Sequence, residues 1–154
     1  MIALPQKPIQ RYLILSLPIV VLMLVAVTYA WSQANRFDGA TLDPVMAYEK
    51  AKSGEITLVD IRRPDEWART GSGQGAHRLD MRDRDFIARL NKLVNGNKNA
   101  KIALMCARGV RSARLSNRLT EAGFTNIIDV PEGMLGSRVG PGWLKRKLPL
   151  NRDG

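Results

Sequence analysis

One stretch decides the fold: Lys101-Ile102-Ala103-Leu104-Met105-Cys106-Ala107-Arg108-Gly109-Val110-Arg111-Ser112. It holds the only cysteine of the chain, Cys106. The apolar residues 102–105 predict a buried strand, and the spacing of apolar residues from Ser112 onward predicts a helix. The thiol therefore falls where a strand ends and a helix begins, which is where ligands bind in open α/β sheets.

The loop between this strand and this helix is suited to hold an anion. Its backbone N–H groups can turn inward, and the N-terminus of the following helix adds a partial positive charge. Arg108 and Arg111 supply two cations. These features favour the thiolate, which is the reactive form of cysteine. We therefore expect Cys106 to be a nucleophile.

The loop resembles the active-site loop of the rhodanese (thiosulfate sulfurtransferase) family. In that family a Cys, four residues and an Arg precede a helix, as do Cys106, Arg111 and Ser112 here. The resemblance implies that Cys106 carries sulfur as a persulfide and that Ser112 supports the loop. The substrate-binding residues that it implies are Ala107, Arg108, Gly109, Val110 and Arg111.

Residues 60–67 carry a second resemblance to the family, an Asp-x-Arg followed by a short helix that ends in an aromatic residue. Asp60, Arg62, Glu66 and Trp67 fall on that pattern. Asp60 and Arg62 follow a predicted central strand, so they can brace the neighbouring loop through charge-assisted hydrogen bonds. We expect a supporting role; an ordinary surface pair with a helix cap is the alternative.

A third resemblance lies near the C-terminus, where Gly133, Gly136, Gly142 and Trp143 suit a glycine-rich turn and a final tryptophan helix. We expect Trp143 to pack in the core. The alternation of strand and helix patterns predicts a parallel sheet with helices on both faces. The predicted fold is an α/β, rhodanese-like three-layer domain over residues 42–150, preceded by a linker at 36–41 and one hydrophobic N-terminal helix.

The N-terminal residues 1–35 are expected to be an anchor or an address. Residues 13–30 contain no charged side chain and are long enough to cross a bilayer as a helix. Lys7 and Arg11 precede this run, so a span over about 13–31 would leave the domain facing the periplasm or the exterior. The alternative is a cleaved signal peptide that releases the domain into the periplasm.

The composition excludes several classes of site. One Cys and one His, His77, leave no intramolecular disulfide and no Cys/His metal cluster. We expect no metal and no organic cofactor, and we expect His77 to be solvated or structural. The net charge of +10 suits anionic partners. The basic residues alternate with acids and few aromatics, so we expect no nucleic-acid binding.

The predicted function is sulfur transfer through a Cys106 persulfide. A small anionic donor such as thiosulfate would supply the sulfur, and a thiol or cyanide would accept it. One alternative is a sulfur carrier or interaction module without turnover. A Cys-based phosphatase or arsenate reductase is a poorer match, because its loop is one residue longer and has a His where Met105 stands. A merely structural thiol is the remaining alternative.

Overall fold

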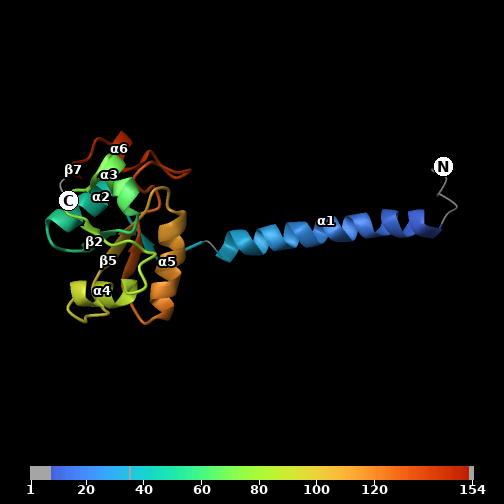
Figure 1. The fold of residues 1–154 in the computed structure, drawn as a ribbon, viewed down its shortest axis with the longest axis horizontal. Coiled ribbons are helices and arrows are strands. Elements are labelled where there is room, and N and C mark those ends of the chain that lie inside the picture. Colours follow the sequence, from blue (N-terminus) through green and yellow to red (C-terminus); the bar gives the residue numbers. More distant parts are fainter. Residues whose placement is uncertain (1–7, 35, 153–154) are drawn as a thin grey trace. The chain divides into compact units, whose positions relative to one another are not determined.

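The computed structural model describes residues 8–34 and 36–152, with side chains described at 17–33 and 36–152. The chain divides after residue 35 into an N-terminal unit and a C-terminal domain (Figure 1). Each is described by itself below.

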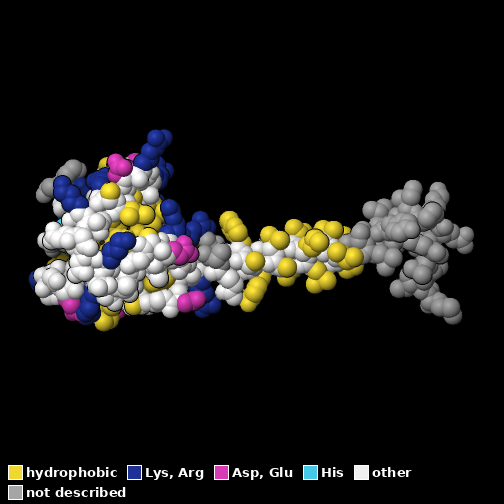
Figure 2. Space-filling model, turned by 90° about the horizontal axis from the view of Figure 1, so that it is seen from below, with side chains coloured by type: hydrophobic (Ala, Val, Ile, Leu, Met, Phe, Trp, Pro, Cys, Tyr) yellow, Lys and Arg dark blue, Asp and Glu magenta, His cyan; other side chains and the backbone are white. Residues whose placement is uncertain are grey.

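The N-terminal unit is one helix, α1 (Pro8–Ala34), with Pro18 inside it. Hydrophobic side chains are exposed along its described part (Figure 2). Among the described residues, no helix is both long enough and apolar enough to cross a membrane. The predicted membrane span over residues 13–31 is therefore not supported. Lys7 and the Arg11 side chain lie outside the described residues, and the periplasmic or exterior location stays a prediction.

A five-stranded sheet forms the centre of the domain, in the order β1-β6-β5-β2-β4. All four pairings in it are parallel, which confirms the predicted parallel sheet. The strands are β1 (Ala40–Thr41), β2 (Thr57–Asp60), β4 (His77–Arg78), β5 (Ile102–Met105) and β6 (Ile127–Asp129). A second, antiparallel pair joins β3 (Ser72–Gly73) to β7 (Leu150–Asn151), and the sequence patterns did not predict it.

Helices cover both faces of the sheet, as expected. They are α2 (Pro44–Lys52), α3 (Pro64–Thr70), α4 (Phe86–Leu93), α5 (Val110–Glu121) and α6 (Gly142–Lys145) (Figure 1). Successive residues of a strand point to opposite faces. On β5, Ile102 and Leu104 therefore pack with side chains of α4 and α5, whereas Ala103 and Met105 pack with those of α2 and α6.

One side-chain cap positions α2, and the predicted burial of Trp143 is confirmed. Asp43 caps α2, because its carboxylate accepts the N–H groups of Val45 at 2.8 Å and Met46 at 3.0 Å. Trp143 is fully buried, and its indole N–H donates to the Pro149 carbonyl at 2.9 Å. This hydrogen bond satisfies the one polar atom of the Trp143 side chain and holds the C-terminal segment against the core.

Candidate functional site

Cys106 lies directly after β5, at the centre of the carboxyl edge of the sheet. The Gly109 N–H donates to its Sγ at 3.2 Å. The Ser112 Oγ lies 3.5 Å from the same Sγ and donates to the Gly109 carbonyl at 3.0 Å. Because α5 begins at Val110, the sulfur also lies at a helix N-terminus. Only 1% of Cys106 is exposed, so a reacting atom must enter the loop to reach it.

Two glycines let a neighbouring turn close on this loop. Gly109 has a φ of +83°, and a Cβ there would lie 2.2 Å from the Pro131 carbonyl oxygen. Gly133 has a φ of +64°, and a Cβ there would lie 2.6 Å from the Cys106 carbonyl oxygen. The Met134 N–H donates to that same Cys106 carbonyl at 2.9 Å. The turn after β6 therefore fixes the shape of the loop, and side chains at either glycine would push them apart.

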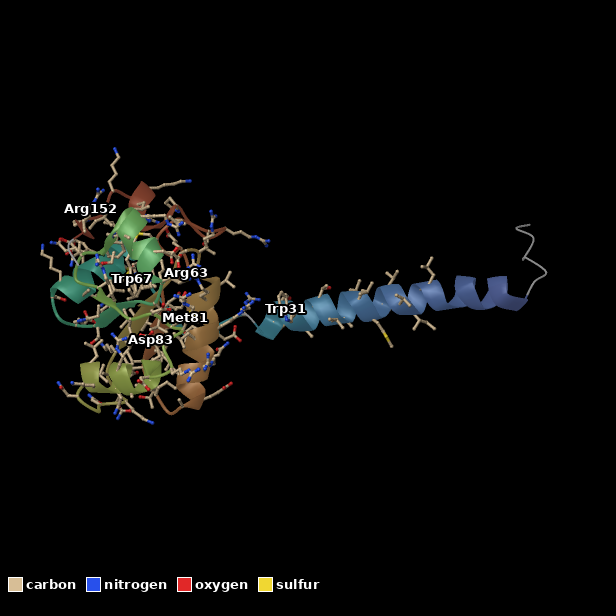
Figure 3. The ribbon with its side chains drawn as sticks, in the orientation of Figure 1. Trp31, Arg63, Trp67, Met81, Asp83 and Arg152 are labelled. Atoms are coloured by element: carbon tan, nitrogen blue, oxygen red, sulfur yellow. The ribbon has the colours of Figure 1, made fainter. Side chains whose placement is uncertain are left out.

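Arg111 closes the loop but is bound to a carboxylate. Its Nη1 and Nη2 donate to Glu66 of α3 at 2.8 and 2.7 Å, from the segment that carries Arg63 and Trp67 in Figure 3. This hydrogen bond lowers the pKa of Glu66 to about 2. The pKa of Arg111 is raised, mainly by Glu66 and also by Cys106, which lies within its reach. The pair thus stays ionised, and Glu66 offsets part of the positive charge beside the thiol.

Asp60 and Arg62 form a separate pair beneath this site. The two side chains are 0% and 1% exposed and are joined at 2.8 Å. Arg62 also donates to Thr70 at 2.9 Å and to the Gly71 carbonyl at 2.7 Å. These bonds hold the two ends of the α3 segment, and none of those described joins the pair to residues 106–111. Direct bracing of the loop by this pair stays a prediction; the bonds shown support α3, which carries Glu66.

Asp129 at the end of β6 is a titratable residue that the sequence reasoning did not single out. It is 3% exposed, and among the described residues its Oδ1 has no hydrogen-bond partner. Burial raises its pKa to about 6, while a hydrogen bond to Ser112 opposes the rise. Ser112 therefore lies between the Cys106 sulfur and a buried carboxyl group. The only sequence signal was an acidic residue closing an apolar strand.

The remaining predicted residues surround the opening of the loop. Ala107 is half-buried, whereas Arg108 and Val110 are exposed. His77 on β4 is exposed as well, which agrees with a solvated residue. In the part of the chain that the structure describes, no group of His, Cys, Asp and Glu side chains could hold a metal ion.

The family model for the rhodanese-like domain matches residues 43–136. The chain therefore belongs to the rhodanese-like domain family.

Curated proteins of several bacteria are also similar to this chain. An uncharacterized protein of Rickettsia rickettsii is 28% identical over 98 residues, which cover 60% of this chain and 80% of the relative. A tRNA uridine(34) hydroxylase of Picosynechococcus is 28% identical over 102 residues, 66% of this chain but only 34% of that enzyme.

Among solved structures, the polysulfide-sulfur transferase homodimer of Wolinella succinogenes superposes with a TM-score of 0.60 and 26% identity, covering 82% of this chain and 88% of that chain. A rhodanese-related protein of Thermoplasma volcanium superposes with a TM-score of 0.54 and 26% identity, covering 75% of this chain and all of that chain (100%).

Proposed function

We propose that this protein is a sulfurtransferase that carries sulfane sulfur on Cys106. The observation that carries the proposal is the setting of the Cys106 sulfur: it accepts the Gly109 N–H at 3.2 Å at the N-terminus of α5. Such donors stabilise a thiolate before the reaction and a persulfide anion after it. The similarity to a polysulfide-sulfur transferase supports the same chemistry.

The proposed reaction has two steps. The Cys106 thiolate attacks the outer sulfur of thiosulfate, an S–S bond forms to Sγ, and sulfite leaves with the electron pair of the broken bond. An acceptor thiolate or cyanide then attacks the outer sulfur of the persulfide, and the Cys106 thiolate is regenerated. No external oxidant or reductant enters, and the steps are those of covalent catalysis by an activated nucleophile.

The size of the loop favours sulfur over phosphate as the group transferred. Between Cys106 and Arg111 stand four residues, and the Arg111 guanidinium is already held by Glu66 at 2.7 Å. The Gly109 N–H points at Sγ itself. A single added sulfur atom on Sγ is smaller than a phosphate group and so demands less room within this loop.

Steady-state turnover tests the proposal. The wild-type chain, Cys106→Ala and Cys106→Ser are assayed with thiosulfate as donor and cyanide as acceptor. We expect turnover in the wild type and none above background in either variant, with unchanged melting temperatures. Undiminished turnover in Cys106→Ala would overturn the assignment of the nucleophile.

The alternative of a carrier without turnover predicts a different outcome in the same assay. A carrier that takes its sulfur only from a protein donor is not loaded by free thiosulfate, so no steady formation of thiocyanate would be seen even with excess cyanide. Repeated turnover supports the enzyme, because it requires that the persulfide be both formed and discharged at the same thiol.

A further inference from the structure

Three cations beside the catalytic loop have no acidic partner. Arginines elsewhere around the site are bound to carboxylates: Arg62 to Asp60 and Arg146 to Glu132. In contrast, Arg108, Arg138 and Lys145 are exposed and form no ion pair within the described residues. Their charge is therefore available to a ligand.

These three cations line one pocket of about 440 Å³, together with Leu135 and residues 136, 137 and 140. The volume lies within the range of small-molecule sites. Arg108 belongs to both the pocket and the loop that holds the thiol. The Leu135 N–H donates to the Ala107 carbonyl at 2.9 Å, which ties the pocket wall directly to the loop.

The turn that carries Arg138 is held in place. The Ser137 N–H donates to the Gly140 carbonyl at 2.9 Å, and the Ser137 Oγ donates to the Pro131 carbonyl at 2.9 Å. Pro131 is also the residue that Gly109 of the loop approaches. Loop and turn thus share one support, so the backbone that carries Arg138 keeps a fixed position relative to the loop that carries Cys106.

The nearest acid does not neutralise the pocket. Glu132 is 4% exposed and lies behind Gly140, where an added Cβ would meet its carboxylate. Its oxygens accept from the Gly142 N–H at 2.8 Å and from Arg146 at 2.6 Å. The pocket itself is lined by no carboxylate among the described residues, and clustered charge of one sign attracts the opposite charge.

The size and position of the pocket distinguish the two substrates of the proposed reaction. In thiosulfate the anionic group is bonded directly to the outer sulfur, so the loop alone can hold both. The pocket lies beyond Arg108 and suits a larger molecule whose charge is remote from its sulfur. Leu135, which is 37% exposed, offers an apolar contact for the part of such a molecule that lies between its charge and its sulfur.

We propose that this pocket binds the sulfur acceptor, and that the acceptor is a small thiol with carboxylate groups remote from its sulfur. The inference rests on the proposed sulfurtransferase function. The carboxylates lie against Arg138 and Lys145, and the thiolate reaches the loop past Arg108. Its sulfur attacks the outer sulfur of the Cys106 persulfide, the bond to Sγ breaks, and a low-molecular-weight persulfide leaves.

Discharge of a preformed persulfide tests the proposal separately from loading. The protein is loaded with thiosulfate or, if thiosulfate does not load it, with inorganic polysulfide, and intact mass confirms the added sulfur. Glutathione, uncharged 2-mercaptoethanol and cationic cysteamine then compete to discharge it, with rates expressed per thiolate. We expect glutathione to be about tenfold faster than 2-mercaptoethanol, because only glutathione carries carboxylates that contact the exposed cations, and exposed charge contacts are individually weak.

The double variant Arg138→Ala/Lys145→Ala should lower the ratio of glutathione rate to 2-mercaptoethanol rate about tenfold. Its matched control, Arg84→Ala/Lys92→Ala, removes the same charge near α4, at the opposite end of the domain from α6 (Figure 1). The control should keep the wild-type ratio. An equal ratio in all three proteins would overturn the proposal, as would an equal loss in both variants, which would indicate attraction by net charge alone.

A nonreactive probe gives a readout that does not depend on activity. S-methylglutathione has the same carboxylates and no thiol. We expect it to shift the backbone amide signals of Ser137 and Val139 in the unloaded protein, and to lose this effect in the Arg138→Ala/Lys145→Ala variant. Failure to load any donor would reject the proposed function, whereas shifts absent from this turn would reject the acceptor pocket.

Discussion

Two arginine–carboxylate pairs involve residues 60–66 of this domain, and they differ in burial and in the distance between partners along the chain. Asp60 and Arg62 are two residues apart and 0% and 1% exposed. Glu66 and Arg111 are 45 residues apart and 13% and 32% exposed. The first pair supports the backbone of α3, and the second closes the cysteine loop. We infer that the buried Asp60–Arg62 pair stabilises the fold. The Glu66–Arg111 pair, called the rim pair below, affects the activity of the cysteine loop.

The largest expected effect is on stability, at Arg62. Arg62→Ala leaves the Asp60 carboxylate buried without its cation, together with the Gly71 carbonyl that Arg62 also binds. Removing one partner of a buried pair lowers the free energy of unfolding by about 3–5 kcal/mol. Urea unfolding followed by circular dichroism measures it, and a loss below about 1 kcal/mol would contradict the supporting role of the pair.

Asp129 sharpens the comparison, because it is buried like Asp60 but forms no ion pair with any of the described residues. Burial raises its pKa to about 6, above the value near 4 of an unfolded Asp. Its contribution to stability is therefore full below pH about 4 and is lost as the pH rises through about 6. The free energy of unfolding of Asp129→Asn, relative to that of the wild type, should rise by on the order of 2 kcal/mol between pH 4 and pH 7.

Urea unfolding at several pH values checks this difference. The control is Asp38→Asn, because Asp38 is an acid whose side chain is 90% exposed. Its stability relative to wild type should stay constant over the same range. If the difference in unfolding free energy between Asp129→Asn and wild type did not change with pH, the pKa of Asp129 would be the same in the folded and unfolded states. That result would contradict the raised pKa.

At the rim pair we expect activity to change more than stability. Arg111→Ala removes a guanidinium within reach of Cys106 and leaves Glu66 as an uncompensated anion beside the loop. We expect kcat/KM for thiosulfate to fall at least tenfold, about 1.4 kcal/mol, with a stability loss of about 1 kcal/mol. The double variant Arg111→Ala/Glu66→Gln should recover part of the activity, since the repelling carboxylate is gone. No recovery would mean that Glu66 acts only as a structural contact.

We expect the smallest effect at an exposed ion pair on α3, the helix that also carries Glu66. Arg69 and Asp65 are joined at 3.0 Å, with side chains 65% and 54% exposed. Arg69→Ala should change the free energy of unfolding by less than about 0.5 kcal/mol. It serves as the matched control for Arg62→Ala, and a loss as large as that at Arg62 would remove the distinction between buried and exposed pairs.

The local parts of the fold and site were predictable from the sequence. The strand before Cys106 follows from a short-range apolar pattern and the burial of Trp143 from the resemblance of the C-terminal segment, and the structure confirms both. The Glu66–Arg111 pair and the approach of Asp129 to Ser112 depend on the order of the strands in the sheet. Spacing along the chain carries no information about such contacts.

The predicted membrane span illustrates a different limit. Uncharged length alone suggested it, whereas the described part of the chain contains no helix that is long and apolar enough to cross a membrane.

Intact mass spectrometry tests the central claim most directly. The wild-type chain and Cys106→Ala are incubated with thiosulfate, desalted and weighed without reductant. The account predicts that the wild type gains the mass of one sulfur atom, that Cys106→Ala gains none, and that later addition of cyanide removes the gain. Equal gains in both proteins, or a gain that cyanide does not remove, would contradict a persulfide on Cys106.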